Sequence, residues 1–158
     1  MKDITIIIPV HKFDEKIKDL LNTAFESIKN NQETYTYGKL IPMFVGPGEV
    51  LEQVGEFFGE NEFAHYCRNT GETDFCSQIN FAAKKVTTEY FSILEFDDIY
   101  ADNWFKMAHD YFYTNESVSL FIPINIITDV EHKQFQYVNE IAWSSSFSQE
   151  IGYLDFDC

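Results

Sequence analysis

Residues 4–10 have the sequence ITIIIPV. An uninterrupted apolar run of this length, rich in β-branched side chains, predicts a strand that is buried on both faces, as the strands of parallel sheets are. Apolar residues then recur at helical spacing from Phe13 to Ile28, which predicts an amphipathic helix after this strand. A strand followed by such a helix is the unit from which α/β domains are built.

The same alternation continues along the chain. Further strands are predicted at 39–45, 63–67, 90–94, 118–126 and 134–138. Helical spacing predicts helices after the first three of these, over residues 50–58, 75–86 and 104–112. With 45% hydrophobic and 17% aromatic residues, the chain can build one buried core. We therefore expect a single α/β domain over residues 1–158, with a mainly parallel sheet flanked by helices on both faces.

Local signals refine these elements. Asp14, Thr73 or Asp74, and Asp102 are the predicted N-caps of the first, third and fourth helices. Pro42 lacks a backbone donor, which predicts that its strand lies at a sheet edge or carries a bulge. The helical stripes predict that the following residues face the sheet: Leu20, Ile28, Phe75, Ile79, Ala82, Ala83 and Val86.

The charge balance limits the partners of the protein. Eleven basic and 26 acidic residues give a net charge of -15. Such a chain repels a nucleic-acid backbone, so we expect no nucleic-acid partner. A phosphorylated ligand would meet the same repulsion, and a metal ion or backbone amides must then neutralise it locally.

The apolar runs of the sequence are too short for a targeting or membrane-spanning segment. The run near the amino terminus is too short for a signal peptide, and no later stretch is long enough to span a membrane, so we expect a cytoplasmic protein. The three cysteines have neither disulfide-scaffold nor zinc-ligand spacing, and we expect reduced thiols.

An acidic cluster follows the predicted strand at 90–94. Glu95, Asp97 and Asp98 should lie at the carboxyl end of that strand, where open α/β sheets bind their ligands. Their oxygens are hard ligands suited to Mg²⁺ or Mn²⁺, and the cation would bridge a diphosphate. Spacing alone leaves a second interpretation open, in which the three carboxylates form a solvated loop.

The end of the first strand supplies the second set of candidates. Pro9, Val10 and His11 should lie beside the acidic cluster, and the His11 ring would stack on or hydrogen-bond a nucleotide. A purely structural or surface role is the alternative for His11, and it is the interpretation we give to the other histidines, His65, His109 and His132.

Several familiar catalytic motifs are missing from the sequence. Gly46-Pro47-Gly48 lacks the further glycine and the Lys-Ser/Thr pair of phosphate-binding loops. A Gly-x-Ser-x-Gly nucleophile motif does not occur either. Dinucleotide binding, Walker-type chemistry and covalent hydrolysis are therefore disfavoured.

Two stretches resemble the family 2 glycosyltransferases, which have a GT-A fold. Residues 6–11, IIIPVH, are similar to the opening Ile-Ile-Ile-Pro-Val-Tyr signature of that family. Gly71, Asn80 and residues 88–98, TEYFSILEFDD, resemble the family stretch in which a helix ends in Gly-Glu-Tyr and a strand delivers the Asp-x-Asp-Asp, or DxD, motif. The similarity covers residues 4–112, and it is the combination of both stretches that is specific.

The resemblance implies a nucleotide-diphosphate sugar donor bound across the first and fourth strands. It implies Mn²⁺ or Mg²⁺ as cofactor, with Asp97 as the principal ligand and Asp98 or Glu95 assisting. The residues that the resemblance places at the nucleotide sugar are Pro9, Val10, His11, Asn80, Glu95 and Phe96.

Three positions depart from the family pattern. Gly46 and Pro47 stand where the family usually has an Asp that recognises the base, Ile79 replaces a frequent Arg, and Glu95 replaces the first Asp of the motif. The resemblance therefore does not imply which base or sugar is bound.

The implied reaction is transfer of the sugar, with inversion, to an acceptor hydroxyl on a glycan, lipid or protein. The catalytic base of the family lies further downstream, and Glu150, Asp155 and Asp157 stand in no recognisable base motif, so we expect a chain truncated at its carboxyl terminus. Two alternatives stay open: a catalytically incomplete or degenerate binding or structural module, and a nucleotidyltransferase. His11-Lys12-Phe13 lacks the glycine-rich phosphate loop that the latter normally carries.

Overall fold

The structure, a computed structural model, describes residues 2–59, 65–68, 71, 73–115, 126–129 and 134–137. Two compact units are present, residues 1–115 and residues 116–158. The second unit contains a β-hairpin-like pair, in which β5 (Ile126–Asp129) runs antiparallel to β6 (Gln134–Tyr137). The strand predicted at 134–138 is thus confirmed, whereas most of the one predicted at 118–126 lies outside the described residues.

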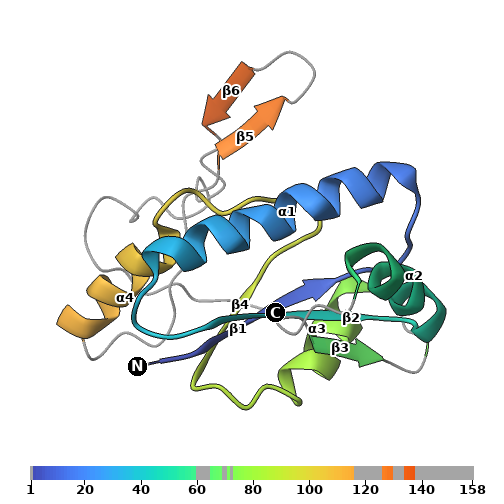
Figure 1. Ribbon diagram of the computed structural model, residues 1–158, viewed down its shortest axis with the longest axis horizontal. Coiled ribbons are helices and arrows are strands. Elements are labelled where there is room, and N and C mark those ends of the chain that lie inside the picture. Colours follow the sequence, from blue (N-terminus) through green and yellow to red (C-terminus); the bar gives the residue numbers. More distant parts are fainter. Residues whose placement is uncertain are drawn as a thin grey trace, which may run out of the picture. The chain divides into compact units, whose positions relative to one another are not determined.

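The first unit is built on four parallel strands, β1 (Ile4–Pro9), β2 (Leu40–Gly46), β3 (His65–Arg68) and β4 (Tyr90–Ile93). Their order in the sheet is β3-β2-β1-β4 (Figure 1). Ile4 of β1 pairs with Leu40 on one side and with Tyr90 on the other. All four strands predicted in this part of the chain are confirmed, with small shifts at their ends.

Four helices connect and follow these strands: α1 (Glu15–Thr34), α2 (Gly48–Phe58), α3 (Phe75–Ala83) and α4 (Trp104–Thr114). Residues of α1, α2 and α4 share one core cluster with one face of the sheet, and Ala82 of α3 belongs to a cluster on the other face (Figure 1). The α/β architecture with helices on both faces is therefore confirmed.

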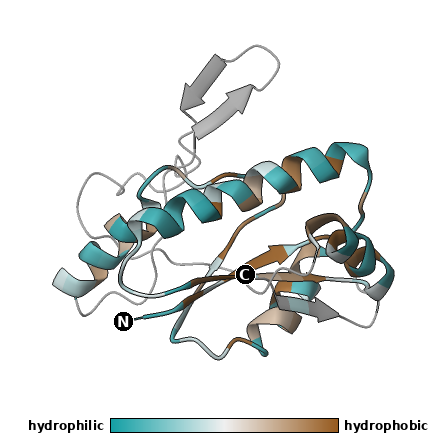
Figure 2. Ribbon diagram, viewed as in Figure 1, coloured by the Kyte–Doolittle hydropathy of each residue, from teal (hydrophilic) through white to brown (hydrophobic). Residues whose placement is uncertain are grey.

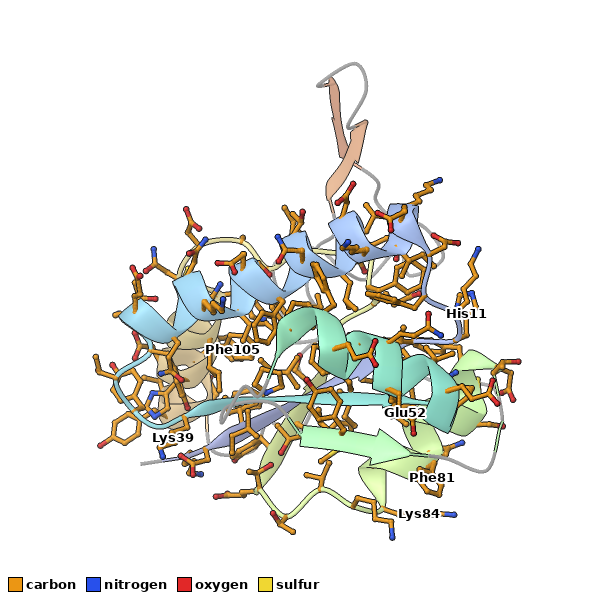
Figure 3. All side chains as sticks on the ribbon, turned by 45° about the vertical axis from the view of Figure 1, so that its right-hand side comes forward. His11, Lys39, Glu52, Phe81, Lys84 and Phe105 are labelled. Carbon is orange, nitrogen blue, oxygen red and sulfur yellow. The ribbon has the colours of Figure 1, made fainter. Side chains whose placement is uncertain are left out.

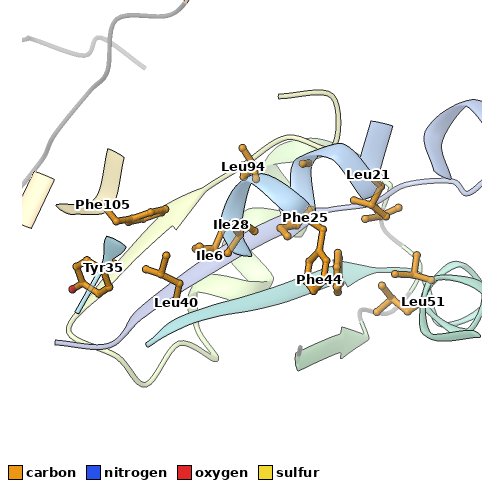
Figure 4. Close-up of a cluster of buried hydrophobic side chains, with 14 residues drawn as sticks. Ile6, Leu21, Phe25, Ile28, Tyr35, Leu40, Phe44, Leu51, Leu94 and Phe105 are labelled. Atoms are coloured by element: carbon orange, nitrogen blue, oxygen red, sulfur yellow. The ribbon is translucent and has the colours of Figure 1, made fainter. Parts of the chain in front are cut away.

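Alternation along the strands sorts the core into these two clusters. Ile6 and Ile8 of β1 pack with Phe44 of β2 and with α1, whereas Ile7 packs with Val45 beneath α3. Successive side chains of a strand point to opposite faces, which is why an unbroken apolar run is needed here. Figure 2 shows the hydrophobic colouring concentrated on the central strands, and Figure 4 shows the larger of the two clusters.

The first helix is amphipathic. Its charged residues lie on the side that faces solvent, and its buried residues lie on one stripe. The buried residues are Ile17, Leu21, Ala24, Phe25, Ser27, Ile28 and Asn31. Of the helices in the described ranges, none is long and apolar enough to cross a membrane.

The caps of α1 and α3 agree with the predictions. The Asp14 carboxylate accepts the Ile17 N–H at 3.0 Å, and the Asp74 carboxylate accepts the Ser77 N–H at 2.8 Å. These hydrogen bonds stabilise the charged form and lower the pKa of both carboxyls below their usual values. Each cap thus satisfies one donor that the first turn of a helix leaves open.

The predicted cap of α4 is wrong. The residue before the helix is Asn103, not Asp102; its backbone is left-handed, with φ 62°, and its side chain makes no capping hydrogen bond. The acceptor comes from another helix instead, because the Phe105 N–H donates to the Asn31 side-chain oxygen at 3.3 Å. A cap supplied by α1 leaves no local signal in the sequence around α4.

The prediction that Pro42 marks a sheet edge is also wrong, since β2 has β1 on one side and β3 on the other. The Ile4 N–H donates to the Lys39 carbonyl and the Val10 N–H to the Val45 carbonyl, so the odd-numbered residues of β2 face β1. The nitrogen of Pro42 therefore points toward the β3 side. On that side the described part of β3 begins opposite Met43.

Two residues are less buried than their stripes predict. Phe75 is 43% exposed at the start of α3, and Leu20 is only half-buried, because the stripe of α1 is centred on Leu21. Ile28 and Ala82 are buried as predicted, while Ile79, Ala83 and Val86 pack at the border of the smaller cluster.

Neighbouring leucines of α1 give a matched test of this packing. Leu21 is 0% exposed, and Leu21→Ala should lower the free energy of unfolding by about 2–5 kcal/mol, through lost transfer free energy and an unfilled cavity. Leu20→Ala removes the same atoms from a half-buried site and should cost clearly less. Urea denaturation of both variants measures the difference, and equal losses would contradict the orientation of α1.

Candidate functional site

The carboxyl ends of β1 and β4 lie side by side. Ile7 pairs with Ile93, and the Leu94 N–H donates to the Ile7 carbonyl at 3.0 Å. The chain that leaves β1 toward His11 and the chain that leaves β4 at Glu95 therefore start from the same edge of the sheet. This edge is the one at which open α/β sheets bind ligands, and the predicted juxtaposition is confirmed.

A turn of four residues follows Leu94, and we call it the acidic turn. It consists of Glu95, Phe96, Asp97 and Asp98. The Asp98 N–H donates to the Glu95 carbonyl at 3.1 Å, which closes a β-turn. Leu94 before the turn is buried, and Phe96 within it packs against the core, whereas the three acidic residues are exposed. Apolar contacts thus fix the turn while its carboxylates face solvent.

The carboxylates of the acidic turn influence one another. The pKa of Glu95 is raised above its usual value, first because surrounding protein atoms remove part of its hydration, and then because the charges of Asp98 and Asp97 disfavour ionisation. The charge of Asp98 also adds to the effect of burial in raising the pKa of the Tyr100 hydroxyl. A cation bound at the turn would relieve the repulsion between these charges.

No three His, Cys, Asp or Glu side chains in the described parts of the chain are grouped so as to hold a metal ion on their own. Mg²⁺ in nucleotide sites needs no such group, since one or two carboxylates and the phosphates of the substrate commonly bind it. The oxygens of Asp97 and Asp98 fit that type of site, and their role as metal ligands stays a prediction.

The rings of His11 and Phe96 join the two segments at this edge. Their centroids are 5.6 Å apart with an interplanar angle of 57°, and His11 is exposed. Figure 3 shows His11 at this end of the sheet and Lys39 at the opposite end. Phe96 is half-buried, so an aromatic surface lies next to the acidic turn.

The side chains of Pro9 and Val10 are buried, although the family motif places these residues at the nucleotide sugar. The Val10 side chain is 0% exposed, and the Val10 N–H donates to the Val45 carbonyl at 2.8 Å. Pro9 is buried in β1. Neither side chain faces solvent, and only His11 of the three presents its side chain at the edge.

Gly46 ends β2 directly beside this segment. A Cβ atom at Gly46 would overlap the carbonyl oxygen of Val10, so residue 46 cannot carry a side chain unless the end of β1 moves. A Cβ at Gly48, in contrast, would meet open space. The absence of an acidic side chain at Gly46 therefore has a packing reason that the sequence alone did not reveal.

Asn80 lies on α3 and is exposed. Its helix covers the face of the sheet opposite α1, with the amino-terminal end near the edge where ligands are expected, because α3 returns antiparallel to the strands. The predicted contact of Asn80 with a nucleotide sugar stays a prediction.

A polar group on α1 was missed by sequence reasoning. Ser27 and Asn31 are buried, and they bind the backbone of the segment between the acidic turn and α4. The signal that could have found them is their spacing, since two polar residues four positions apart fall on the otherwise apolar stripe of the helix.

A sequence profile described as "Glycosyl transferase family 2" matches residues 5–156. A search of curated proteins gave no match.

The coupling within the acidic turn can be tested by titration. Asp98→Asn removes a charge that raises the pKa of Glu95, so the Glu95 pKa should fall toward its usual value. Glu33→Gln, an exposed change near the end of α1, should leave it unchanged. Carboxyl carbon shifts followed by NMR across the acid range give the pKa values. An unchanged Glu95 pKa in Asp98→Asn would show that the two carboxylates do not interact.

Proposed function

We propose, because the chain belongs to glycosyl transferase family 2, that it binds a nucleotide-diphosphate sugar at the carboxyl edge of β1 and β4 and transfers the sugar with inversion. Family membership makes the protein a glycosyltransferase. The observation that carries the finer proposal is the acidic turn, which begins one residue after the end of β4 and whose Phe96 ring lies against the exposed ring of His11.

The acidic turn supplies what a diphosphate needs in a chain of net charge -15. Asp97 and Asp98 would hold Mg²⁺ or Mn²⁺ together with the phosphates of the donor, since hard cations take carboxylate and phosphate oxygens. When bound, the cation stabilises the charge that develops on the leaving diphosphate. Because the turn is fixed by Leu94 and Phe96, its carboxylates are already exposed before a donor arrives.

The aromatic pair at the same edge would receive the nucleoside. His11 is exposed, and its ring centroid lies 5.6 Å from that of half-buried Phe96, so an aromatic surface is present on which a flat base could stack. Gly46 offers only its backbone there, because a side chain would overlap the carbonyl of Val10. We therefore propose that the base is held mainly by stacking and backbone contacts rather than by a carboxylate from β2.

A second candidate function is a donor-binding module without transferase activity. The observation that favours it is Gly46, which leaves the end of β2 without the acidic side chain usual in the family. Measuring the turnover of a bound donor distinguishes the two candidate functions. Donor hydrolysis or acceptor-dependent transfer that requires Mn²⁺ and Asp97 supports the enzyme, and tight binding without turnover supports the module.

Removal of one carboxylate tests the donor site directly. Asp97→Ala should abolish Mn²⁺-dependent binding of nucleoside diphosphates and leave the melting temperature nearly unchanged, because Asp97 is exposed and supports no core contact. Isothermal titration calorimetry with uridine, guanosine and cytidine diphosphates, with and without Mn²⁺, measures the loss. Asp19→Ala removes an exposed carboxylate from α1 and serves as the control. Equal affinities in Asp97→Ala and the parent protein would remove the main support for the site.

A further inference from the structure

The segment that follows the acidic turn folds back onto β4 through Tyr100. The Tyr100 hydroxyl lies 2.7 Å from the Ser92 hydroxyl oxygen and donates to the Ile93 carbonyl at 3.3 Å. Its ring packs edge-on against Phe105, with centroids 4.7 Å apart, and stacks near Trp104. One side chain therefore joins the strand before the turn to the helix after it.

The backbone of the same segment is bound from the other side by α1. The Tyr100 N–H donates to the Ser27 hydroxyl at 3.2 Å, and the Asn31 amide donates to the Ala101 carbonyl at 3.1 Å. Ser27 is in turn fixed by its own bond to the Ala24 carbonyl at 2.6 Å. Both polar side chains are buried, so their bonds to this partly buried segment are shielded in part from competition with water.

These contacts fix both ends of a short arch. The Leu94 N–H, bound to β1, holds the chain before the acidic turn, and Tyr100 holds it after the turn. Only the five residues 95–99 lie between the two anchors. A loop of this length with fixed ends has few backbone conformations, and the positions of its carboxylates are limited accordingly.

We propose that Tyr100 is a positioning residue for the metal and diphosphate site, which holds Asp97 and Asp98 in place by tying the end of the acidic turn to Ser92 and Ile93 of β4. The proposal rests on the proposed function insofar as it concerns metal binding. The ordering of the turn by Tyr100 is independent of that function. Partners that orient a metal ligand typically change metal affinity by about 10- to 100-fold when they are removed.

The decisive variant is Tyr100→Phe, which keeps the ring and removes the hydroxyl. Its matched control is Tyr35→Phe, because the Tyr35 hydroxyl also donates to a backbone carbonyl, that of Lys2 at 2.7 Å, near the opposite end of β1. Tyr100→Phe loses the hydroxyl contacts with Ser92 and Ile93, and Tyr35→Phe loses the bond to Lys2, so the melting temperatures of both variants should fall. Only Tyr100→Phe should affect the acidic turn.

Two readouts are measured on both variants. The first uses no metal: NMR hydrogen exchange of the Asp98 amide, which donates to Glu95, should lose protection in Tyr100→Phe and not in Tyr35→Phe. The second is calorimetric affinity for Mn²⁺ in the presence of uridine diphosphate, which should fall about 10-fold in Tyr100→Phe only. Ser92→Ala removes the contact between the two hydroxyls but leaves the bond of Tyr100 to the Ile93 carbonyl, so it should reproduce both effects in smaller size. The double variant should add little to Tyr100→Phe, because the two hydroxyls form one contact.

The outcomes separate the two proposals. If Tyr100→Phe and Tyr35→Phe behave alike in both readouts, the positioning role is overturned and only a general stabilising role is left. If the parent protein does not bind Mn²⁺ with the nucleotide, the donor site fails. In that case hydrogen exchange of the Asp98 amide alone decides whether Tyr100 orders the acidic turn. Unchanged protection of this amide in Tyr100→Phe would reject the ordering role.

Discussion

β1 has strands on both of its edges and helices on both of its faces, and the rest of the first unit depends on this burial. Ile6, Ile7 and Ile8 are 0% exposed, so three consecutive side chains must be apolar and must point alternately into two separate cores. Each core needs its own helical cover, which α1 and α3 supply. Because β2 and β4 both pair with β1 in parallel, the loops that follow all three strands leave at one edge. The position of the candidate site is therefore a consequence of how β1 is buried.

The parts of this fold that can be predicted from sequence are those in which the signal and its cause lie close together in the chain. The run at 4–10 and the caps at Asp14 and Asp74 are of this kind, and so is the strand that leads into the acidic turn. Pro42 misled the prediction because β2 pairs on both sides, with β1 and with β3, and the sequence around Pro42 does not show which neighbours a strand has. Leu20 misled it because adjacent leucines leave the centre of a helical stripe uncertain by one residue.

In the candidate site, too, local features could be predicted from the sequence and long-range contacts could not. The sequence placed the acidic cluster at a strand end and beside His11, and the structure places both there. It could not show that Val10 is buried, that Gly46 lies against its carbonyl, or that Tyr100 and two polar residues of α1 hold the segment after the turn. Apart from the contacts of Tyr100 with β4, those facts come from contacts between residues that are tens of positions apart. Chemistry carried by a short motif is visible in a sequence, whereas the scaffold that orients it is distributed over several elements.

The cap of α4 has a consequence for the order in which the molecule assembles. Asn103 makes no side-chain cap, and the first turn of α4 receives its acceptor from Asn31, 74 residues away in the chain from the Phe105 donor. A helix whose start is defined by a partner has a weak nucleus of its own, because nucleation already fixes several residues for one hydrogen bond. We therefore expect α4 to gain its full stability only after α1 has docked on the sheet, and the two helices to behave as one cooperative unit. The polypeptide just beyond the acidic turn would accordingly be among the last parts of this unit to become ordered during folding.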